Sequence, residues 1–189
     1  MINNKDYSTK NVDYVIEECR KGNRRAQFEI YKRYSKAMYN TSLRIVNNPY
    51  DAEDVIQEAF FSGFKRINEY SGKVTFGAWI KKIVIHKSID HIRKSKRMFQ
   101  LTERMAEQIE NKVDPNGHED DKIIHAEVEQ IKLGIQKLPE GYKIILSLYL
   151  IEGYDHEEIS QILGISSSTS RSQFVRAKKK LIEILKSNS

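Results

Sequence analysis

The first half of the chain alternates apolar and polar residues with the period of an α-helix. Apolar side chains recur every three to four positions at Phe28, Tyr31, Tyr34, Met38, Leu43 and Val46. Asn47-Asn48-Pro49 breaks this pattern, and a second apolar series runs from Val55 to Ile67. Residues 68–79 contain two glycines and are predicted to form a loop before a third series that ends at Ile92. This spacing predicts a helical domain over residues 12–98.

Residues 99–122 have a different composition. They contain the only Pro-Asn-Gly cluster of the chain and seven acidic residues against three basic ones. Such a segment is typical of a linker, and we predict a flexible acidic linker with at most a transient helical turn. As a coil it would have a mean reach of about 25–30 Å.

Helical spacing returns in residues 123–187. Pro139 ends a helix predicted from Ile123 to Leu138, and the segments EGYKIILSLYLIEG, DHEEISQILG and 167–186 predict three more. The whole chain has only three prolines and nine glycines, which is few for a β-sandwich. The predicted fold is therefore all-α, with two small helical domains joined by the acidic linker.

The end of the second domain carries the signals of two helices separated by a tight turn. Asp155 and Glu158 have the spacing of a capping box, Gly164 suits a left-handed helix end, and Ser166 can cap the amides of Ser168 or Thr169. The buried face of the second helix is predicted to contain Phe174, Val175, Leu181, Ile182 and Leu185. This arrangement is that of a helix-turn-helix motif, whose second helix enters the major groove of DNA.

The polar residues of this second helix are candidates for DNA contacts. Hydroxyl groups can donate to or accept from base edges, arginine can bind guanine through two hydrogen bonds, and lysine suits phosphate. The candidates are Ser167, Ser168, Thr169, Arg171, Ser172, Arg176 and Lys180. The alternative is a solvated helix with a serine-rich cap, which the complete order of cap, helix, glycine, cap and helix makes the weaker interpretation.

A second basic cluster lies in the first domain. Between Lys73 and Met98 there are eight lysines and arginines and one acidic residue, Asp90. Tyr70, Phe76 and Trp79 stand at its head. Aromatic residues among basic ones suit unpaired bases, because each stacked base contributes about 1–3 kcal/mol. The spacing of Trp79 from neighbouring isoleucines is equally compatible with burial in the core.

An acidic face is predicted on the helix that contains DAEDVIQE. Asp51, Asp54 and Glu58 are spaced to share one side of that helix. They suit a basic protein partner or a metal ion, and the alternative is a solvated face with acids near a helix N-terminus.

The net charge and the cysteine content indicate a class of partner and a cellular compartment. The formal net charge of +6 favours a polyanionic partner. Cys19 is the only cysteine, so an intramolecular disulfide is excluded and a reducing compartment fits. The chain has no apolar signal core at its start and no apolar run of about 20 residues that could span a membrane. We therefore expect a cytoplasmic protein without membrane insertion.

Three segments together resemble a known family. In order, DAEDVIQEAFFSGF, FGAWIKKIVIHKSIDHIRK and LPEGYKIILSLYLIEGYDHEEISQILGISSSTSRSQFVRAKKKL resemble the sigma-70 family of bacterial RNA polymerase sigma factors, most closely its extracytoplasmic-function (ECF) group. The resemblance covers about residues 24–98 and 130–186. It implies a region 2-like domain at 12–98, a linker at 99–122 and a region 4-like domain at 123–187. It also implies a promoter-recognition subunit with no catalytic residue, metal or cofactor.

The resemblance also implies roles for individual residues. Binding to the clamp of core RNA polymerase falls to Asp51, Asp54, Gln57 and Glu58. Contacts with the minus-ten element fall to Lys73, Trp79, Lys81, Lys82, His86 and Arg93, and the helix-turn-helix candidates would read the minus-thirty-five element. The implied partners are the clamp and flap of core RNA polymerase, promoter DNA and an anti-sigma factor, which this group commonly has.

The chain departs from the family pattern at three positions. His86 stands where the family usually has asparagine, which bears on minus-ten specificity. Ser170 stands where a buried valine or similar residue is usual, so either the helix packs less well there or the serine points at DNA. Gln173 replaces a usual basic residue, which weakens an expected phosphate contact.

Two other functions fit parts of the sequence. A stand-alone helix-turn-helix regulator would explain residues 150–186 but would leave the acidic helix and the Trp79 region without a role. A metal-dependent enzyme could use Asp51, Asp54, Glu58, His86, Asp90 and His91, but the chain has no metal-binding or phosphate-binding motif.

Overall fold

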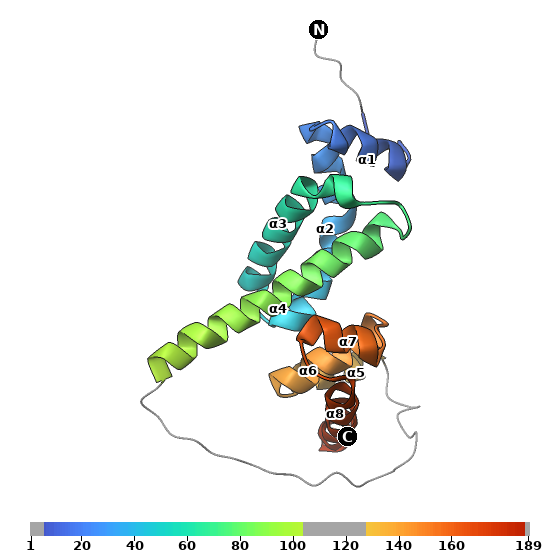
Figure 1. Ribbon diagram of the computed structural model, residues 1–189. Helices are drawn as coiled ribbons and strands as arrows, with labels where there is room; N and C mark the ends of the chain where they lie inside the picture. The colour runs from blue at the N-terminus through green and yellow to red at the C-terminus, as the bar shows by residue number, and fades with distance from the viewer. Residues whose placement is uncertain (1–5, 104–127, 188–189) are drawn as a thin grey trace. The chain divides into compact units, whose positions relative to one another are not determined.

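The computed structural model describes residues 6–103 and 128–187. These residues form helices and connecting segments, with no strand among them, which confirms the all-α prediction (Figure 1). They divide into two compact units, with the boundary between Lys94 and Ser95. Within the described ranges no helix is long and apolar enough to cross a membrane.

The first unit is built from four α-helices and one short 3-10 turn. They are α1 (Val12–Arg20), α2 (Arg24–Val46), α3 (Pro49–Lys65), η1 (Ile67–Glu69) and α4 (Phe76–Glu103). An asparagine side chain caps each of the first three helices: Asn11, Asn23 and Asn48 accept hydrogen bonds from amides in the following turn. Asn47, with φ of 57°, ends α2 in the left-handed region, so the predicted break at 47–49 is present.

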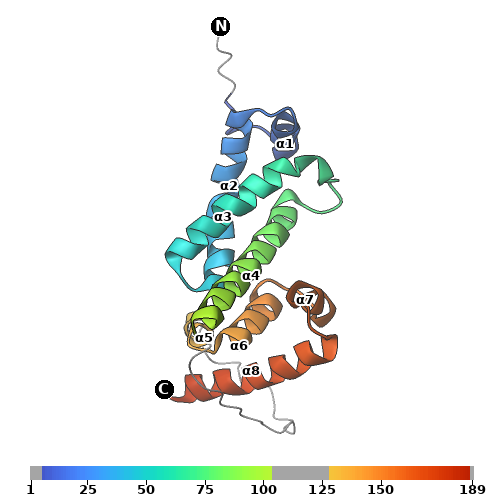
Figure 2. The same ribbon diagram turned by 60° about the vertical axis from the view of Figure 1, so that its left-hand side comes forward.

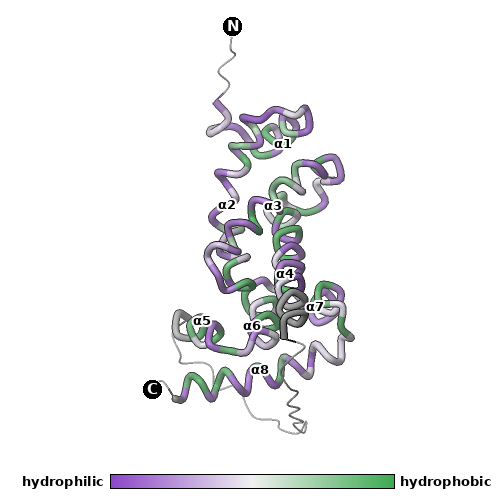
Figure 3. Tube along the Cα trace, turned by 90° about the vertical axis from the view of Figure 1, so that its left-hand side faces the viewer, coloured by the Kyte–Doolittle hydropathy of each residue, from purple (hydrophilic) through white to green (hydrophobic). Residues whose placement is uncertain are grey.

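The core of this unit lies where α2, α3 and α4 pack against one another (Figure 2). Tyr31 meets Phe60 edge-on at 4.9 Å between ring centroids, and Tyr34 lies 5.3 Å from Phe76. Gly63 allows the close approach of α3 to α4, because a Cβ atom there would lie 2.7 Å from Ile80 Cδ1. Most of the residues at the predicted apolar spacing lie in or against this core. Figure 3 shows the alternation of hydrophobic and hydrophilic residues along these helices.

Three details of this unit differ from the sequence prediction. Phe28, the first residue of the predicted apolar series, is 67% exposed. The loop is shorter than 68–79, because η1 precedes it and α4 already begins at Phe76, where the Thr75 hydroxyl accepts a hydrogen bond from the Ala78 amide (3.3 Å). At its other end α4 continues to Glu103, past the predicted start of the linker; residues 104–122 of the linker lie outside the described residues.

The segment before α1 also belongs to the first unit. Tyr7 is buried, and its hydroxyl donates to the Glu18 carboxylate (3.1 Å) while accepting from the Asn23 side-chain amide (2.7 Å). Arg33 of α2 donates to the backbone carbonyls of Tyr7, Ser8 and Lys10. These hydrogen bonds fix the N-terminal segment onto α1 and α2, five residues ahead of the predicted domain start.

The second unit contains the remaining helices. They are α5 (Val128–Gln136), α6 (Glu140–Leu146), a short π-helical stretch η2 (Ser147–Ile151), α7 (His156–Leu163) and α8 (Ser167–Ser187). Its core includes Ile135 and Leu138 from the α5 end, Leu146 from α6, and Ala177 and Leu181 from α8. Four predicted helices correspond to these elements, although residues 123–127 of the first lie outside the described residues.

We predict that Cys19 is chemically inert in the folded chain. It is buried, and desolvation, followed by the negative charge of Glu18, raises the pKa of its thiol to about 12. Because the thiolate is the reactive form, Ellman's reagent at pH 8 should leave the native protein unlabelled and should titrate one thiol after unfolding in urea. Rapid labelling of the native chain would contradict the burial of this side chain.

Candidate nucleic-acid and protein interfaces

The turn between α7 and α8 is fixed by the capping groups that the sequence predicts. The Asp155 carboxylate accepts from the Glu158 amide (2.8 Å), and the Glu158 carboxylate accepts in return from the Asp155 amide (3.0 Å). Gly164 ends α7 with φ of 64°, and Ser166 Oγ accepts from the Thr169 amide (3.0 Å). A short helix, a three-residue turn and a long second helix therefore form a helix-turn-helix.

The polar residues predicted on α8 lie on its outer side or at its border with the core. Ser168, Thr169, Arg171, Ser172 and Lys180 are exposed, and Ser167 and Arg176 are half-buried. Ser168 and Ser172 share a helical row, because they are four residues apart. The first two turns of α8 thus present hydroxyl and guanidinium groups next to each other, the donors and acceptors that base edges require.

Val175 does not lie on the buried face of α8, so its predicted burial is wrong. Its side chain is 56% exposed, in the same row as Ser168 and Ser172. Neighbouring residues of a helix point about 100° apart, so Phe174 and Val175 do not share one face of α8. Phe174 is the residue that turns inward, with its ring 4.5 Å from Tyr149 and 5.4 Å from His156. An apolar side chain among polar ones suits a thymine methyl group.

The structure decides between the two interpretations of Ser170. This side chain is fully buried, and its Oγ shares a hydrogen bond of 2.9 Å with His156 Nδ1. The imidazole ring is stacked on Tyr149, with ring centroids 4.8 Å apart and an interplanar angle of 27°. Ser170 therefore joins the first turn of α7 to the first turn of α8 and does not face outward. Gln173, the other departure on this helix, is half-buried.

In the first unit, the acidic residues of α3 meet the basic residues of α4. His91 Nε2 lies 3.3 Å from an Asp51 carboxylate oxygen, and Lys87 Nζ lies 3.6 Å from Glu58. Asp54, which lies between these two acids on the same face, is exposed. Asp51 and Glu58 thus each have a partner within the unit, but the Glu58 side chain is still 65% exposed, and Asp54 is exposed as well.

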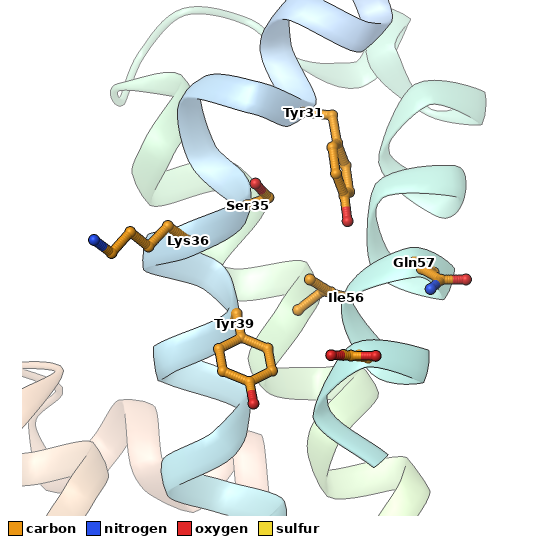
Figure 4. Close-up of a pocket in the computed structure, with 7 residues that line it drawn as sticks. Tyr31, Ser35, Lys36, Tyr39, Ile56 and Gln57 are labelled. Atoms are coloured by element: carbon orange, nitrogen blue, oxygen red, sulfur yellow. The ribbon is translucent and has the colours of Figure 1, made fainter. Parts of the chain in front are cut away.

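Gln57 belongs to a different side of α3. It borders an open groove between α2 and α3, together with Tyr31, Ser35, Lys36, Tyr39, Glu53 and Ile56 (Figure 4). The phenols of Tyr31 and Tyr39 and the amide of Gln57 give the groove several hydrogen-bonding groups, next to the apolar side chain of Ile56. The α3 helix therefore offers two neighbouring polar surfaces, one toward α4 and one toward α2.

Trp79 is mainly a core residue. It is half-buried, with ring centroids 5.5 Å from Tyr70 and 5.4 Å from Phe76. The loop before it is anchored by Tyr70, whose hydroxyl donates to the Val74 carbonyl (2.9 Å) and whose own carbonyl accepts from Arg20 (2.5 Å). Lys73 lies exposed in this loop. The aromatic cluster of Tyr70, Phe76 and Trp79 thus anchors the loop to the core.

The basic residues of α4 flank His86. Lys82, His86 and Arg93 are exposed and Lys81 is half-buried, and Asp90 lies 3.6 Å from Arg93. Partial desolvation, and then the positive charge of Lys82, lower the pKa of His86, while Asp90 opposes them. His86 is therefore neutral near pH 7 and can both donate and accept a hydrogen bond, as an asparagine side chain can.

The candidate metal ligands are not assembled into one site. Asp51 pairs with His91 and Glu58 with Lys87. In the described part of the chain, no group of three or more His, Cys, Asp or Glu side chains could hold a metal ion.

These surfaces define a two-unit helical protein with a helix-turn-helix in its second unit, and comparisons with known proteins specify the class further. The model of sigma-70 region 2 matches residues 30–98, and that of sigma-70 region 4 matches residues 129–181. ECF RNA polymerase sigma factor SigW of Bacillus subtilis (strain 168) is 27% identical over 176 residues, which are 88% of this chain and 92% of SigW. The ECF RNA polymerase sigma-E factor of Haemophilus influenzae is 26% identical over 171 residues, 87% and 89% of the two chains.

Two solved structures share the fold. The sigma factor RpoE of Bartonella quintana, in a complex with the anti-sigma factor NepR, gives a TM-score of 0.56 at 17% identity and covers 84% of this chain and 95% of its own. CnrH, in a complex with the cytosolic domain of CnrY, gives a TM-score of 0.54 at 19% identity and covers 95% and 100%.

The chain carries sigma-70 regions 2 and 4 and belongs to the sigma-70 family, as an ECF RNA polymerase sigma factor. It is a transcription initiation factor and not an enzyme.

We predict that Ser170 stabilises the second unit whereas Ser172 does not. Ser170→Ala would leave His156 Nδ1 without its partner and should lower the free energy of unfolding by about 1–3 kcal/mol. Ser172→Ala is the matched control, because it brings the same gain in helix propensity at an exposed position.

Urea unfolding followed by far-UV circular dichroism would measure the difference between the two variants. Trp79, the only tryptophan, reports on the first unit by fluorescence and should show the same transition in both. Equal stability of the two variants would show that the hydrogen bond to His156 contributes nothing.

Proposed function

We propose that this protein binds core RNA polymerase and directs it to promoters by reading two DNA elements, one with each unit. The main support is the exposed N-terminal half of α8, which presents hydroxyl and guanidinium groups within the segment that matches sigma-70 region 4. We assign residues 12–98 and 123–187 to the two DNA-reading domains and residues 99–122 to the linker between them. Such a role places the protein in the cytoplasm, where transcription occurs.

The second unit would read the minus-thirty-five element. Ser168, Thr169, Ser172 and Arg171 are proposed to face base edges, and Ser167 to support them at the border of the helix. Arg176 and Lys180 lie further along α8 and suit phosphates, which contribute affinity but no sequence information. Exposed Val175 adds an apolar contact for a thymine methyl group in the same row.

The first unit would open and hold the minus-ten element. Lys73 in the loop, and Lys81, Lys82 and Arg93 on α4, are proposed to follow the phosphates of the displaced strand. Neutral His86 would hydrogen-bond a base rather than a phosphate. Trp79 would serve chiefly by supporting the loop, since its ring packs on Tyr70 and Phe76, with its accessible edge left for a flipped base.

The acidic helix α3 would bind the clamp of core RNA polymerase. Asp54 and Glu58 are exposed carboxylates of this surface, and Gln57 borders the groove next to it. Asp51 and Glu58 contact α4 and would contribute partly by holding α3 and α4 together. The second unit would contact the flap, and an anti-sigma factor is proposed as a further partner because two fold relatives were solved with such proteins or with a cytosolic partner domain.

Run-off transcription with core polymerase on a promoter library tests this function directly. We expect transcription to require this chain and to depend on both promoter elements. Dimeric binding to a palindromic site without polymerase would instead favour a stand-alone helix-turn-helix regulator.

We predict that Arg171→Ala relaxes base preference at one position of the minus-thirty-five element. The loss of its donors should cost about 1–3 kcal/mol for the preferred base pair and little for the others. This preference is measured by competition binding of holoenzyme to promoters that carry each of the four base pairs in turn at each minus-thirty-five position. A uniform loss on every sequence would assign Arg171 to phosphate instead.

We predict that Asp54→Ala weakens binding to core polymerase, whereas Asp13→Ala has a smaller effect. Both carboxylates are exposed and both variants remove one negative charge from the first unit, but Asp13 lies on α1, outside the α3 surface assigned to the clamp. Titration of labelled protein with core polymerase gives both affinities. Equal losses would mean that overall charge, and not the α3 surface, determines binding.

A further inference from the structure

One acidic residue of α7 contacts two of the residues that are proposed to read DNA. Glu157 Oε1 accepts a hydrogen bond from the Ser167 hydroxyl (2.7 Å) and another from Arg171 Nη2 (3.1 Å). Ser167 and Arg171 are four residues apart, so they stand one above the other on the side of α8 that borders α7.

This contact is not needed to hold the fold together. The side chains of Arg171 and Glu157 are 59% and 65% exposed, and such surface ion pairs contribute only about 0–1 kcal/mol to stability. The neighbouring residue His156 already joins the same two turns through buried Ser170. The first turn of α7 thus makes two contacts with α8. His156 holds the helix itself through buried Ser170, and Glu157 orients the exposed Arg171 side chain.

The exposed contact changes what Arg171 can do near DNA. A guanidinium without a carboxylate partner pairs with any phosphate, which raises affinity for all sequences alike. Glu157 engages one Nη of Arg171 and offsets its charge, and the other N–H groups stay available in a fixed direction. A guanine edge with two acceptors can use those directed donors, whereas a phosphate next to Glu157 meets an opposing negative charge.

We propose that Glu157 is a positioning residue for promoter specificity: it holds Arg171 and Ser167 toward a guanine-containing base pair and discourages Arg171 from pairing with phosphate. This inference rests on the proposed function of α8. It adds a residue outside the recognition helix to the determinants of minus-thirty-five selectivity.

The test compares holoenzymes that carry Glu157→Ala, Glu157→Gln, Arg171→Ala or the Glu157→Ala and Arg171→Ala pair. Affinities are measured for promoters with every base pair at each minus-thirty-five position and for nonspecific duplex, over a range of salt concentrations. Circular dichroism melting of each free variant checks the fold, which should hold because the capping box uses Asp155 and Glu158.

We expect Glu157→Ala to bind nonspecific DNA more tightly, with a salt dependence steeper by about one phosphate contact, a slope change of about 0.9. Its preference should weaken at the base pair that Arg171→Ala also affects, by about fivefold to tenfold, the lower part of the range for one lost base contact. Adding Glu157→Ala to Arg171→Ala should change that preference no further. Glu157→Gln keeps an oxygen acceptor but no charge, so it should retain more of the base preference than Glu157→Ala.

Glu183→Gln is the matched control. It removes one negative charge from the same unit and releases Lys180, which lies 2.9 Å from Glu183. Because lysine suits phosphate, this variant should bind all sequences more tightly and leave base preference unchanged.

The failures can be told apart. If Arg171→Ala alters base preference and Glu157→Ala does not, the inference about Glu157 is wrong and the function of α8 stands. If Glu157→Ala alters a position that Arg171→Ala leaves intact, Glu157 contacts a base itself and is not a positioning residue. If no variant and no base change affects holoenzyme binding, the proposed function of α8 fails as well.

Discussion

The junction between the first turns of α7 and α8 is the constraint on which the proposed DNA-reading surface depends. Two helix starts meet there, and each has its amides satisfied by its own cap, Asp155 for α7 and Ser166 for α8. The caps leave His156 and Glu157 free to reach across to α8. A recognition helix can discriminate bases only if its side chains approach from a fixed direction, and these polar contacts fix that direction within two turns.

In the first unit, contacts between whole helices likewise hold the proposed binding surfaces in place. Its core packs α2, α3 and α4 through aromatic and aliphatic side chains, while Lys87 pairs with Glu58 and His91 contacts Asp51 at the rim. The acidic and basic surfaces thus lie on helices that brace each other, so binding of polymerase to α3 and of DNA to α4 would act on one rigid body. The anchoring of the loop by Tyr70 and Arg20 extends the same support to the segment before Trp79.

The sequence predicted the structure correctly where the pattern lies within a few neighbouring residues. Asp155, Glu158, Gly164 and Ser166 act within one turn of their own positions, and all four have the predicted roles. The helical periods likewise located the cores, because 3.6-residue spacing directly reflects burial. The family resemblance, carried by three ordered motifs, was confirmed by the matches to regions 2 and 4.

The Val175 prediction failed for a local reason, because Val175 points about 100° away from Phe174 and lies in the row of Ser168 and Ser172. The features that were missed depend instead on contacts between distant residues. The bonds from Ser170 to His156 and from Tyr7 to Glu18 span 14 and 11 residues, with no periodic pattern to mark them. The contacts of Asp51 with His91 and of Glu58 with Lys87 link two helices across a whole loop, and no local pattern marks them.

The Ser170–His156 bond has a consequence for exchanging recognition helices between relatives. An apolar residue at position 170 would need only a matching shape from the facing side chain on α7, but Ser170 needs a matching hydrogen-bonding group. In this chain the two positions therefore form one hydrogen-bonded pair that is split between two helices. A graft that transfers α8 alone, in either direction, would bury one polar group without its partner, and a transfer of residues 156–176 together would keep the pair intact.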